Sequence, residues 1–287
     1  MKKADFAVID IGSNSIRYLG SAPEKCLITT RLAEGLVSTG MLSEAAMERS
    51  VAAITSFAEK ARAEGLVPAA YATSAVRDAR NSAVFLARVE AACGVRIDVL
   101  SGEREARYAR LGAAEEGGIV DIGGGSSQLV TEGFAASYPV GCVRAKEWGE
   151  QSGAQSFETL QEALFSRFRI YRFPRLFVPH WTGVGGTITT VAALSRGMSV
   201  YDRSAVASIV LSQEDVEAQA HALYFMGDAE RAQHPLLAER HDVIVEGALI
   251  LLYIMHGMGI YELHVSDADG MEAVSYTHLT LPTICSV

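Results

Sequence analysis

Apolar positions along the chain follow two different periods, and the segments that carry them alternate. In several stretches apolar residues recur every three or four positions, the spacing of an amphipathic helix. Continuous apolar runs lie between these stretches and are typical of buried strands. Helices are predicted near 43–65, 81–94, 103–114, 157–171, 187–195, 212–226 and 242–258, and strands at 67–72 and 95–100. This alternation predicts an α/β fold.

Capping residues support several of these boundaries. Ser43 can cap the first helix, and Asn81 or Ser82 can cap the second. Ser212 begins a Ser-Gln-Glu-Asp sequence that resembles a capping box. Gly94 follows the second helix at the position where glycine commonly ends one.

A segment near the start of the chain is repeated in its second half. Residues 6–19 and 119–130 share an apolar strand, the sequence Asp-Ile-Gly, two small residues, a serine and a second apolar strand. The aspartates of the two copies, Asp10 and Asp121, are 111 positions apart. We interpret the repeat as one β-hairpin used twice, at the start of each of two domains. The predicted domains are 1–117 and 118–274, followed by a tail, 275–287, that is either non-native or disordered and is assigned no function.

Composition is that of an ordinary globular protein. The length of 287 residues agrees with two domains at roughly 150 residues each. No apolar run reaches the roughly 17 residues that a membrane helix needs, and the first residues do not resemble a signal peptide. The four cysteines lie far apart and are expected to be reduced core residues rather than zinc ligands or disulfides. We therefore expect a soluble, cytoplasmic protein.

The charge balance is acidic. With 34 acidic and 25 basic side chains, the formal net charge is −9, which argues against a general nucleic-acid-binding surface. We accordingly expect neither a nucleic acid nor a membrane as partner. An anionic substrate stays compatible with this charge, because the field in a pocket depends on local groups.

The two hairpins carry the sharpest chemical signal. Glycine at a tight turn exposes backbone N–H groups that form a concave anion-binding nest, and neighbouring serine or asparagine side chains add donors. Phosphate is the ligand that such loops bind best, whereas an aspartate at the strand end would hold Mg²⁺ or position a water molecule. The alternative, that these glycines only make turns, is disfavoured by the repetition. The candidate phosphate-binding residues are Gly12, Ser13, Asn14 and Ser15 in the first copy and Gly123, Gly124, Gly125 and Ser126 in the second.

Two further segments leave alternatives open. The sequence 183–190 opens a helix with Gly185, Gly186 and Thr187, so its N–H groups and helix dipole can bind phosphate, or its glycines can serve tight packing alone. The segment 167–175 places four arginines among aromatic residues. It can be a track for a long polyanion, a nucleic-acid contact, or the end of an amphipathic helix with solvated arginines.

Five motifs, in matching order and spacing, resemble those of the exopolyphosphatase/guanosine pentaphosphate phosphatase (Ppx/GppA) family. They are residues 10–15, 73–81, 101–106, 121–126 and 183–187, and the resemblance covers about residues 5–272. The family belongs to the superfamily of actin, sugar kinases and heat-shock ATPases. The resemblance implies two ribonuclease-H-like (actin-like ATPase) domains that flank a central cleft.

The resemblance also implies roles for individual residues. Glu105 matches the catalytic glutamate that orients or deprotonates the attacking water, and Arg77 matches a phosphate-binding arginine. Asp10 and Asp121 are expected to assist catalysis as ligands of Mg²⁺. Gln128 departs from the family pattern, because many relatives have an acidic residue there, and a neutral amide is a poor base and a weaker metal ligand.

The function expected from the sequence is metal-dependent hydrolysis of the terminal phosphoanhydride of inorganic polyphosphate. The first alternative is hydrolysis of the 5′ γ-phosphate of guanosine pentaphosphate. The second is a polyphosphate- or nucleotide-binding sensor without turnover, which the glutamine at position 128 favours. A homodimer is compatible with each of them.

Overall fold

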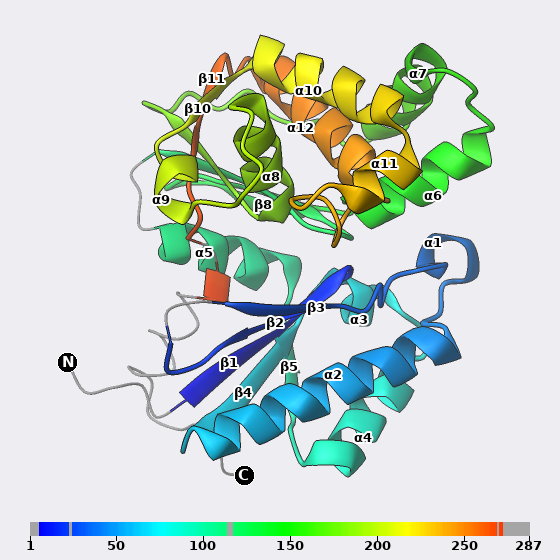
Figure 1. Ribbon diagram of the computed structural model, residues 1–287, viewed down its shortest axis with the longest axis vertical. Helices are drawn as coiled ribbons and strands as arrows, with labels where there is room; N and C mark the ends of the chain where they lie inside the picture. The colour runs from blue at the N-terminus through cyan, green and yellow to red at the C-terminus, as the bar shows by residue number, and fades with distance from the viewer. Residues whose placement is uncertain (1–5, 23–24, 114–116, 269, 272–287) are drawn as a thin grey trace. The chain divides into compact units, whose positions relative to one another are not determined.

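The computed structural model describes residues 6–22, 25–113, 117–268 and 270–271 (Figure 1). These residues form two compact units. Unit 1 contains the described residues up to 112, together with 270 and 271, and unit 2 contains those from 113 to 268. The predicted tail, 275–287, lies outside the described residues.

Unit 1 is built on a five-stranded sheet with the strand order β3-β2-β1-β4-β5. Its strands are β1 (Phe6–Ile11), β2 (Ser15–Leu19), β3 (Cys26–Thr29), β4 (Val67–Ala72) and β5 (Ile97–Val99). Its helices are α1 (Leu36–Thr39), α2 (Glu44–Ala63), α3 (Ser74–Asp78), α4 (Ser82–Cys93) and α5 (Gly102–Ala113). The first three strands are antiparallel neighbours, and β1, β4 and β5 run parallel to one another. Helix α2 packs on β1, β2 and β4, with α4 beside it (Figure 1).

Local sequence explains where two of these helices begin. The hydroxyl of Ser43 accepts the backbone N–H of Ala46, which confirms the predicted cap of α2. Asn81 precedes α4 but does not cap it through its side chain. The Asn81 amide instead accepts the N–H of Leu42 and donates to the Leu42 carbonyl, both at 2.9 Å. Asn81 therefore occupies the predicted N-cap position without a side-chain cap, because a distant backbone segment uses both polar atoms of this amide.

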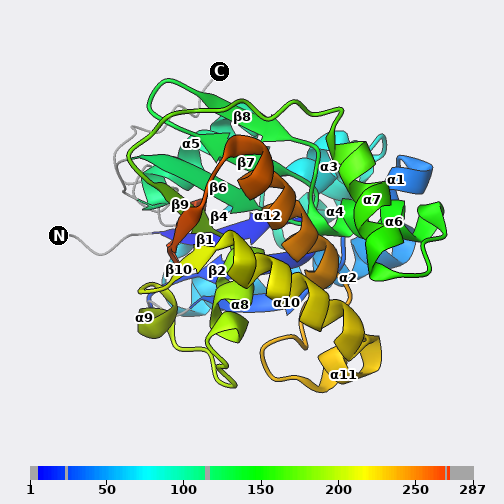
Figure 2. The same cartoon turned by 90° about the horizontal axis from the view of Figure 1, so that it is seen from above.

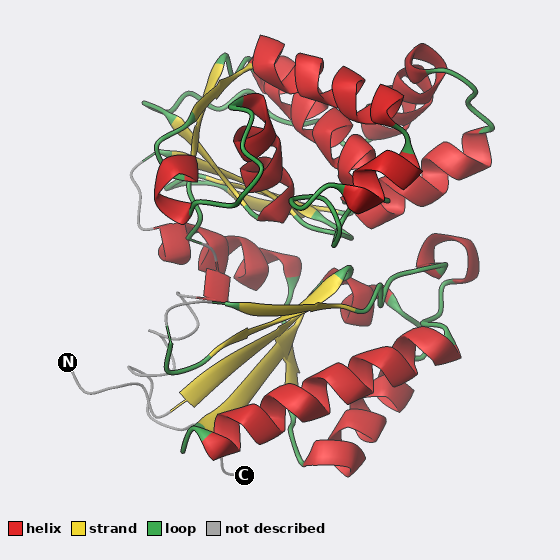
Figure 3. Ribbon diagram, viewed as in Figure 1, coloured by secondary structure: helices red, strands yellow, loops and turns green. Residues whose placement is uncertain are grey.

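Unit 2 contains a six-stranded sheet with the order β10-β11-β9-β6-β7-β8. Its strands are β6 (Gly118–Ile122), β7 (Ser127–Val130), β8 (Ala135–Tyr138), β9 (Trp181–Val184), β10 (Val210–Ser212) and β11 (Glu262–Val265). Its helices are α6 (Cys142–Ser152), α7 (Phe157–Phe168), α8 (Gly186–Ser195), α9 (Arg203–Val206), α10 (Gln213–Met226), α11 (Asp228–Gln233) and α12 (Ile244–Met258). Helix α12 packs on β6 and contacts α6, α7, α8 and α10, so that a layer of helices covers the sheet (Figure 3). Ser212 and Asp215 form the predicted capping box of α10.

The repeat seen in the sequence is also a repeat of strand pairing. Asp10 lies opposite Arg17 in the first hairpin, and Asp121 lies opposite Gln128 in the second. Every pair in the second hairpin is the corresponding pair of the first moved by the same 111 positions. In each unit the hairpin continues into a third antiparallel strand, and two parallel strands extend the sheet on the other side. This is the ribonuclease-H-like strand order, and it confirms the predicted α/β fold class with two such domains.

The core of unit 1 includes a residue from the far end of the chain. Met271 is fully buried against Val8, Tyr71 and Leu100, and Tyr108 of α5 packs on the same cluster. Alternate residues of a strand share one face, so Asp10 lies on the face of the sheet that carries Val8. Helix α5 therefore covers the face from which the Asp10 side chain projects.

Two expectations drawn from composition are refined by the structure. Of the three cysteines in the described part of the chain, Cys142 is buried, whereas Cys26 and Cys93 are half-buried, and all three are free thiols. Among these three, the expectation of core cysteines is thus confirmed for Cys142 and wrong for Cys26 and Cys93. No helix in that part combines the length and the hydropathy that a membrane span requires.

Candidate active site

The first hairpin turns through a backbone hydrogen bond at its glycine. The N–H of Gly12 donates to the carbonyl of Ser15 at 3.1 Å, and a Cβ on Gly12 would lie 2.9 Å from that oxygen. The turn therefore requires glycine. The Asn14 carbonyl accepts the N–H groups of Thr30 and Arg31 at 3.1 and 2.8 Å, so the segment after β3 holds the loop in place.

The second hairpin repeats this arrangement. The N–H of Gly123 donates to the carbonyl of Ser126 at 2.9 Å, and the carbonyls of Gly123 and Gly124 accept N–H groups from the first turn of α6. Within the described part of the chain, the N–H groups of Gly124, Gly125 and Ser126 donate to no protein group. A loop with its carbonyls bound on one side and consecutive N–H groups left over can accommodate an anion, and the predicted phosphate nest stays a prediction.

Asp10 in the first hairpin already has a cationic neighbour. The Arg17 Nε donates to Asp10 Oδ2 at 3.0 Å, and Nη2 of the same guanidinium also contacts this oxygen. The Asp10 side chain is only 5 % exposed. Because Arg17 lies directly across the hairpin, it neutralises the carboxylate from within the protein.

The hydroxyl of Ser13 is held by a residue that follows β4, the parallel neighbour of β1. Ser13 and Ser74 share a hydrogen bond at 3.0 Å between their hydroxyl oxygens, and both side chains are almost fully buried. Ser74 begins α3, the short helix that follows β4 and carries Arg77. The carboxyl ends of β1 and β4 are thus joined directly by their side chains.

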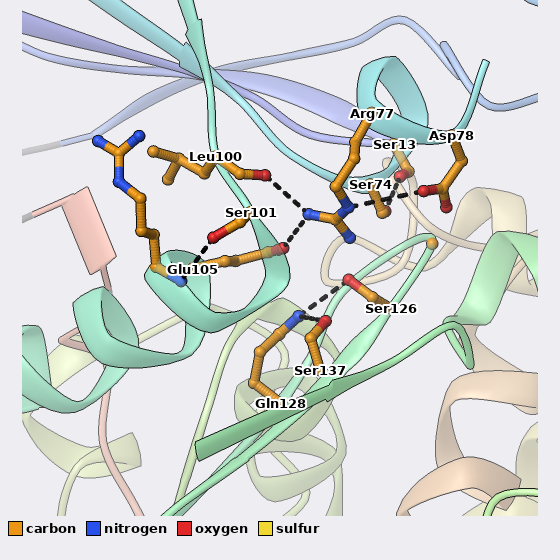
Figure 4. A network of polar contacts seen from close by, with 12 residues as sticks. Ser13, Ser74, Arg77, Asp78, Leu100, Ser101, Glu105, Ser126, Gln128 and Ser137 are labelled. Atoms are coloured by element: carbon orange, nitrogen blue, oxygen red, sulfur yellow. Dashed lines mark hydrogen bonds and ion pairs between the residues drawn. The ribbon is translucent and has the colours of Figure 1, made fainter. Parts of the chain in front are cut away.

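Glu105 and Arg77 form the central polar pair of unit 1 (Figure 4). The Arg77 Nη1 donates to Glu105 Oε2 and to the carbonyl of Leu100, each at 3.0 Å. The Arg77 Nε lies 3.5 Å from a carboxylate oxygen of Asp78. Ser101 accepts the Arg104 N–H through its hydroxyl and thereby begins α5, the helix that positions Glu105. Both partners of the central pair are mostly buried, with 25 % of the Arg77 side chain and 16 % of the Glu105 side chain exposed.

The environment of Glu105 raises its pKa to about 7. Burial is the main cause, because it disfavours the charged carboxylate. The positive charge of Arg77 and its hydrogen bond lower the pKa, whereas the negative charges of Asp10 and Asp78 raise it further. A carboxyl group with such a pKa can accept a proton near neutral pH and release it again, as a general base must.

Asp121 lies at the end of β6, where the loop after β9 approaches it closely. Gly185 in this loop has φ +89°, and a Cβ there would lie 2.6 Å from Asp121 Oδ1. Only glycine fits on both counts. Across the hairpin, the buried Gln128 donates through Nε2 to the hydroxyls of Ser126 and Ser137 at 2.9 and 3.0 Å (Figure 4).

The third glycine motif begins α8, as predicted. Gly186 is the first residue of this helix, and a Cβ on it would collide with the guanidinium of Arg240. Thr187 is buried beneath α12, where Gly247 allows the two helices to approach. The structure therefore places a cation against the N-terminal turn of α8.

The candidate residues form two groups, one within each unit. In unit 1 the structure brings the first hairpin together with Arg77 and Glu105, and in unit 2 it brings Asp121 and the second hairpin together with Gly185. Sequence reasoning missed Arg17, Ser74 and Arg240. The spacing of Arg17 from Asp10 could have revealed it, since a tight hairpin of that length sets the two opposite each other. Arg240 comes from a distant helix start, and no local pattern signals it.

The chain resembles proteins that cleave phosphoanhydride bonds. The model of the Ppx/GppA phosphatase family matches residues 24–280. Exopolyphosphatase 2 of Mycobacterium tuberculosis is 31 % identical and aligns with 94 % of this chain and 97 % of its own length. Guanosine-5′-triphosphate,3′-diphosphate pyrophosphatase of Photobacterium profundum is 27 % identical, over 94 % of this chain and 58 % of its own length.

Solved structures agree with the sequence relatives. The crystal structure of an exopolyphosphatase-like protein superposes with a TM-score of 0.85 at 27 % identity and covers 96 % of this chain and 99 % of that one. The Ppx/GppA family member from Aquifex aeolicus gives a TM-score of 0.71 at 27 % identity, covering 96 % of this chain and 97 % of the other. The repeated hairpins, the buried arginine–glutamate pair and a family match over nearly the whole chain lead to one conclusion: this protein belongs to the Ppx/GppA phosphatase family and is a hydrolase of phosphoanhydride bonds.

Proposed function

We propose that the protein is an exopolyphosphatase, which removes the terminal phosphate of inorganic polyphosphate as orthophosphate with the help of a divalent metal ion. The pair formed by Glu105 and Arg77 carries this proposal. A carboxyl group with a pKa of about 7 is a base at neutral pH, and the guanidinium 3.0 Å away is the side-chain group best suited to a phosphate.

The hairpins support phosphate as the group that is bound. The N–H groups of Gly124, Gly125 and Ser126 have no acceptor within the described residues, and an anion would satisfy all three. In the first hairpin the buried hydroxyl of Ser13 adds a donor or acceptor at the strand end. We assign phosphate binding to Gly12–Ser15 and Gly123–Ser126, with Gly185–Thr187 as a further donor set at the start of α8.

In the proposed reaction, Glu105 accepts a proton from a water molecule while the water oxygen attacks the terminal phosphorus. The bond between this phosphorus and the bridging oxygen breaks, and its electron pair stays on the shortened chain. Arg77 donates hydrogen bonds to the transferred phosphate and offsets its charge. One water is consumed for each orthophosphate released, and Glu105 then returns its proton to solvent.

Substrate binding would make Glu105 a stronger base. Arg77 lowers the pKa of Glu105 in the free protein, and a phosphate that shares this guanidinium neutralises part of its charge. The pKa of Glu105 would therefore rise in the complex. The same arginine thus links occupation of the site to readiness for proton transfer.

Each hairpin offers one aspartate to a divalent cation, Asp10 in β1 and Asp121 in β6. Arg17 contacts Oδ2 of Asp10, so a cation at this carboxylate would share it with the guanidinium. Asp121 lies opposite Gln128 and beside Gly185, and the residue after Gly185 lies against the guanidinium of Arg240. No group of three or more His, Cys, Asp or Glu side chains suited to a metal ion occurs in the described part of the chain.

A single protein carboxylate with phosphate oxygens and water as the remaining ligands is the arrangement that Mg²⁺ commonly adopts. We therefore propose Asp10 and Asp121 as the candidate protein ligands of Mg²⁺, one in each hairpin. Bound Mg²⁺ would supply charge neutralisation on the phosphate oxygens.

Orthophosphate release from long-chain polyphosphate and from guanosine pentaphosphate, each with and without Mg²⁺, tests the proposal. We expect Mg²⁺-dependent release from polyphosphate, and Glu105→Gln should lower kcat by a factor of about 10² to 10⁴. Glu103→Gln is the matched control, because Glu103 lies on the same helix but is exposed and paired with Arg107. Release from guanosine pentaphosphate alone would establish the alternative substrate. Polyphosphate binding without release from either compound would establish a sensor.

A further inference from the structure

One stretch of unit 2 is basic in an otherwise acidic protein. From residue 163 to residue 201 the sequence contains no aspartate or glutamate. Four of the five arginines in this stretch lie within nine residues and form what we call the basic segment, Arg167, Arg169, Arg172 and Arg175. All four side chains are exposed. The chain as a whole has a net charge of −9, so this local excess of positive charge needs an explanation.

The four arginines of the basic segment stand apart from most others in having neither a side-chain hydrogen bond nor an ion pair within the described residues. Within the described part of the chain, none of the four makes a side-chain hydrogen bond or an ion pair, and Arg167 contacts only the ring of Trp148, 5.5 Å away. Thirteen of the remaining sixteen arginines make a side-chain hydrogen bond or an ion pair, as Arg196 does with Asp215. Guanidinium groups left without a carboxylate are available to an anion from outside.

An aromatic anchor fixes the position of the segment. The ring of Phe173 packs on Tyr138 of β8 at 4.6 Å and on Tyr253 of α12 at 5.9 Å between centroids. The chain passes beside β8 on its way from α7 to β9 (Figure 2). Because Phe173 is held in this way, Arg172 and Arg175 on either side of it are directed to solvent rather than into the core.

The anchor also places the segment next to the second hairpin. Tyr138 is the cross-strand partner of Ser127, and Ser137 of the same strand accepts a hydrogen bond from Gln128. Ser127 directly follows Ser126, whose N–H belongs to the proposed phosphate nest. Within unit 2, a chain of phosphates held at the hairpin can therefore continue along the edge strand β8 to the arginines.

We propose that the basic segment binds internal phosphates of a long polyphosphate chain and so determines preference for chain length. This inference rests on the proposed exopolyphosphatase function. Arginine suits the role because its planar fork pairs with phosphate oxygens and stays charged at any physiological pH. Arg169, Arg172 and Arg175 follow at intervals of three residues, at most about 10 Å apart along the chain. Because polyphosphate carries a negative charge on every phosphate unit, it can pair with these arginines wherever the chain lies along the segment.

The apolar residues near the segment do not favour a membrane instead. Ile170 is 71 % exposed and Phe177 is 99 % exposed, but they are separated by the arginines and by the half-buried anchor Phe173. An interfacial membrane helix would present a continuous apolar face, and this segment is not helical beyond Phe168. The chemistry on the surface is therefore that of a polyphosphate contact.

The test compares long-chain polyphosphate with tripolyphosphate, which is too short to reach beyond the hairpin. The variant replaces Arg169, Arg172 and Arg175 by glutamine, and the matched control replaces the exposed, ion-paired Arg88, Arg96 and Arg107 by glutamine. Each exposed contact is expected to contribute a factor of about two, so KM for long chains should rise about eightfold. The KM for tripolyphosphate and kcat should not change, and the control should behave as wild type. An equal change for both substrates, or none for the long chain, would overturn the proposal.

A second measurement separates this inference from the proposed function. Binding of long-chain polyphosphate is titrated in the Glu105→Gln background, where turnover does not interfere. Loss of three charged contacts should reduce the slope of log affinity against log salt by about 2, at 0.7 per contact as for single-stranded nucleic acids. If the protein fails to hydrolyse polyphosphate but shows this arginine-dependent binding, the function fails and the inference stands. Arginine-dependent binding of anionic lipid vesicles or single-stranded RNA, with polyphosphate binding unaffected, would refute it.

Discussion

Replacing Arg77 by glutamine is expected to move the pH dependence of the reaction. In the wild type, the raised pKa of Glu105, about 7, means that activity falls as pH drops through neutrality, because the protonated carboxyl cannot accept a proton. Arg77 opposes the effect of burial and holds the pKa down. Without this guanidinium the carboxyl should stay protonated to higher pH, so the acidic limb of the profile should move upward.

The geometry gives the size of this movement. Two unit charges about 4 Å apart interact by about 4 kcal/mol at an effective dielectric constant of 20. The side chains are 25 % and 16 % exposed, and solvent therefore screens part of this energy. Taking about half, roughly 2 kcal/mol, and 1.36 kcal/mol for a tenfold change in the ionisation constant, the limb should move up by about 1.5 pH units.

The assay measures kcat/KM with tripolyphosphate as the substrate, from about pH 5 to about pH 10. This range lies on both sides of the expected midpoints of the wild type and the variant. This ratio reports ionisations of the free protein, so the phosphate-binding role of Arg77 affects its height rather than its midpoint. Arg77→Lys is the charge-retaining control and should shift the limb less. A wild-type midpoint near the ordinary glutamate pKa, or an Arg77→Gln profile with an unmoved midpoint, would refute the assignment of Glu105 as the base.

Three other outcomes follow from the structure. Glu105 and Glu246 both have a pKa raised from 4.5 to about 7, chiefly by burial, so their contribution to the free energy of unfolding falls as pH rises from 4.5 to 7. In urea unfolding at pH 8, glutamine at either position should therefore add at most about 3 kcal/mol, with activity lost only at Glu105. A destabilised Glu246→Gln protein would contradict this. Gly185→Ala should lower the free energy of unfolding by about 2–4 kcal/mol and abolish activity, because φ is +89° and the new Cβ would lie against Asp121. A melting curve equal to that of the wild type would contradict this and show that the loop adapts. Gln128→Glu places a charge on a side chain that is 1 % exposed, so its Tm in EDTA should be several degrees below that of the wild type. Added Mg²⁺ should restore the Tm, because a bound cation offsets the buried charge. A Tm that does not respond to Mg²⁺ would count against the metal position.

The repeat was the part of the fold most open to prediction. Identical spacing around Asp10 and Asp121 predicts one hairpin twice, and the pairing registers agree position by position. Strands β3 and β8 were not predicted, because four-residue strands with half-buried side chains carry little pattern of their own and depend on the neighbouring strand. The central cleft and the domain boundary at 117/118 stay predictions.

In the site, too, residues could be predicted where a local sequence motif marks them, but not where their role depends on contacts with distant parts of the chain. Glu105 and Arg77 could be assigned through the family resemblance, but their hydrogen bond and the raised pKa depend on burial, which no spacing reveals. Arg17 escaped notice because its role depends on cross-strand register. Asn81 is the N-cap residue that the sequence predicts, but the sequence does not show that Leu42, far away in the chain, occupies its amide.

Met271 has a consequence for how the polypeptide folds as it is made. This methionine is buried among Val8, Tyr71 and Leu100, although more than 150 residues of unit 2 are synthesised between it and the rest of unit 1. The earlier unit therefore leaves the ribosome with a gap in its core, and truncating a buried methionine to alanine typically costs about 2–5 kcal/mol. Unit 2 is contiguous and can finish first, so the N-terminal half of the protein reaches its final packing last.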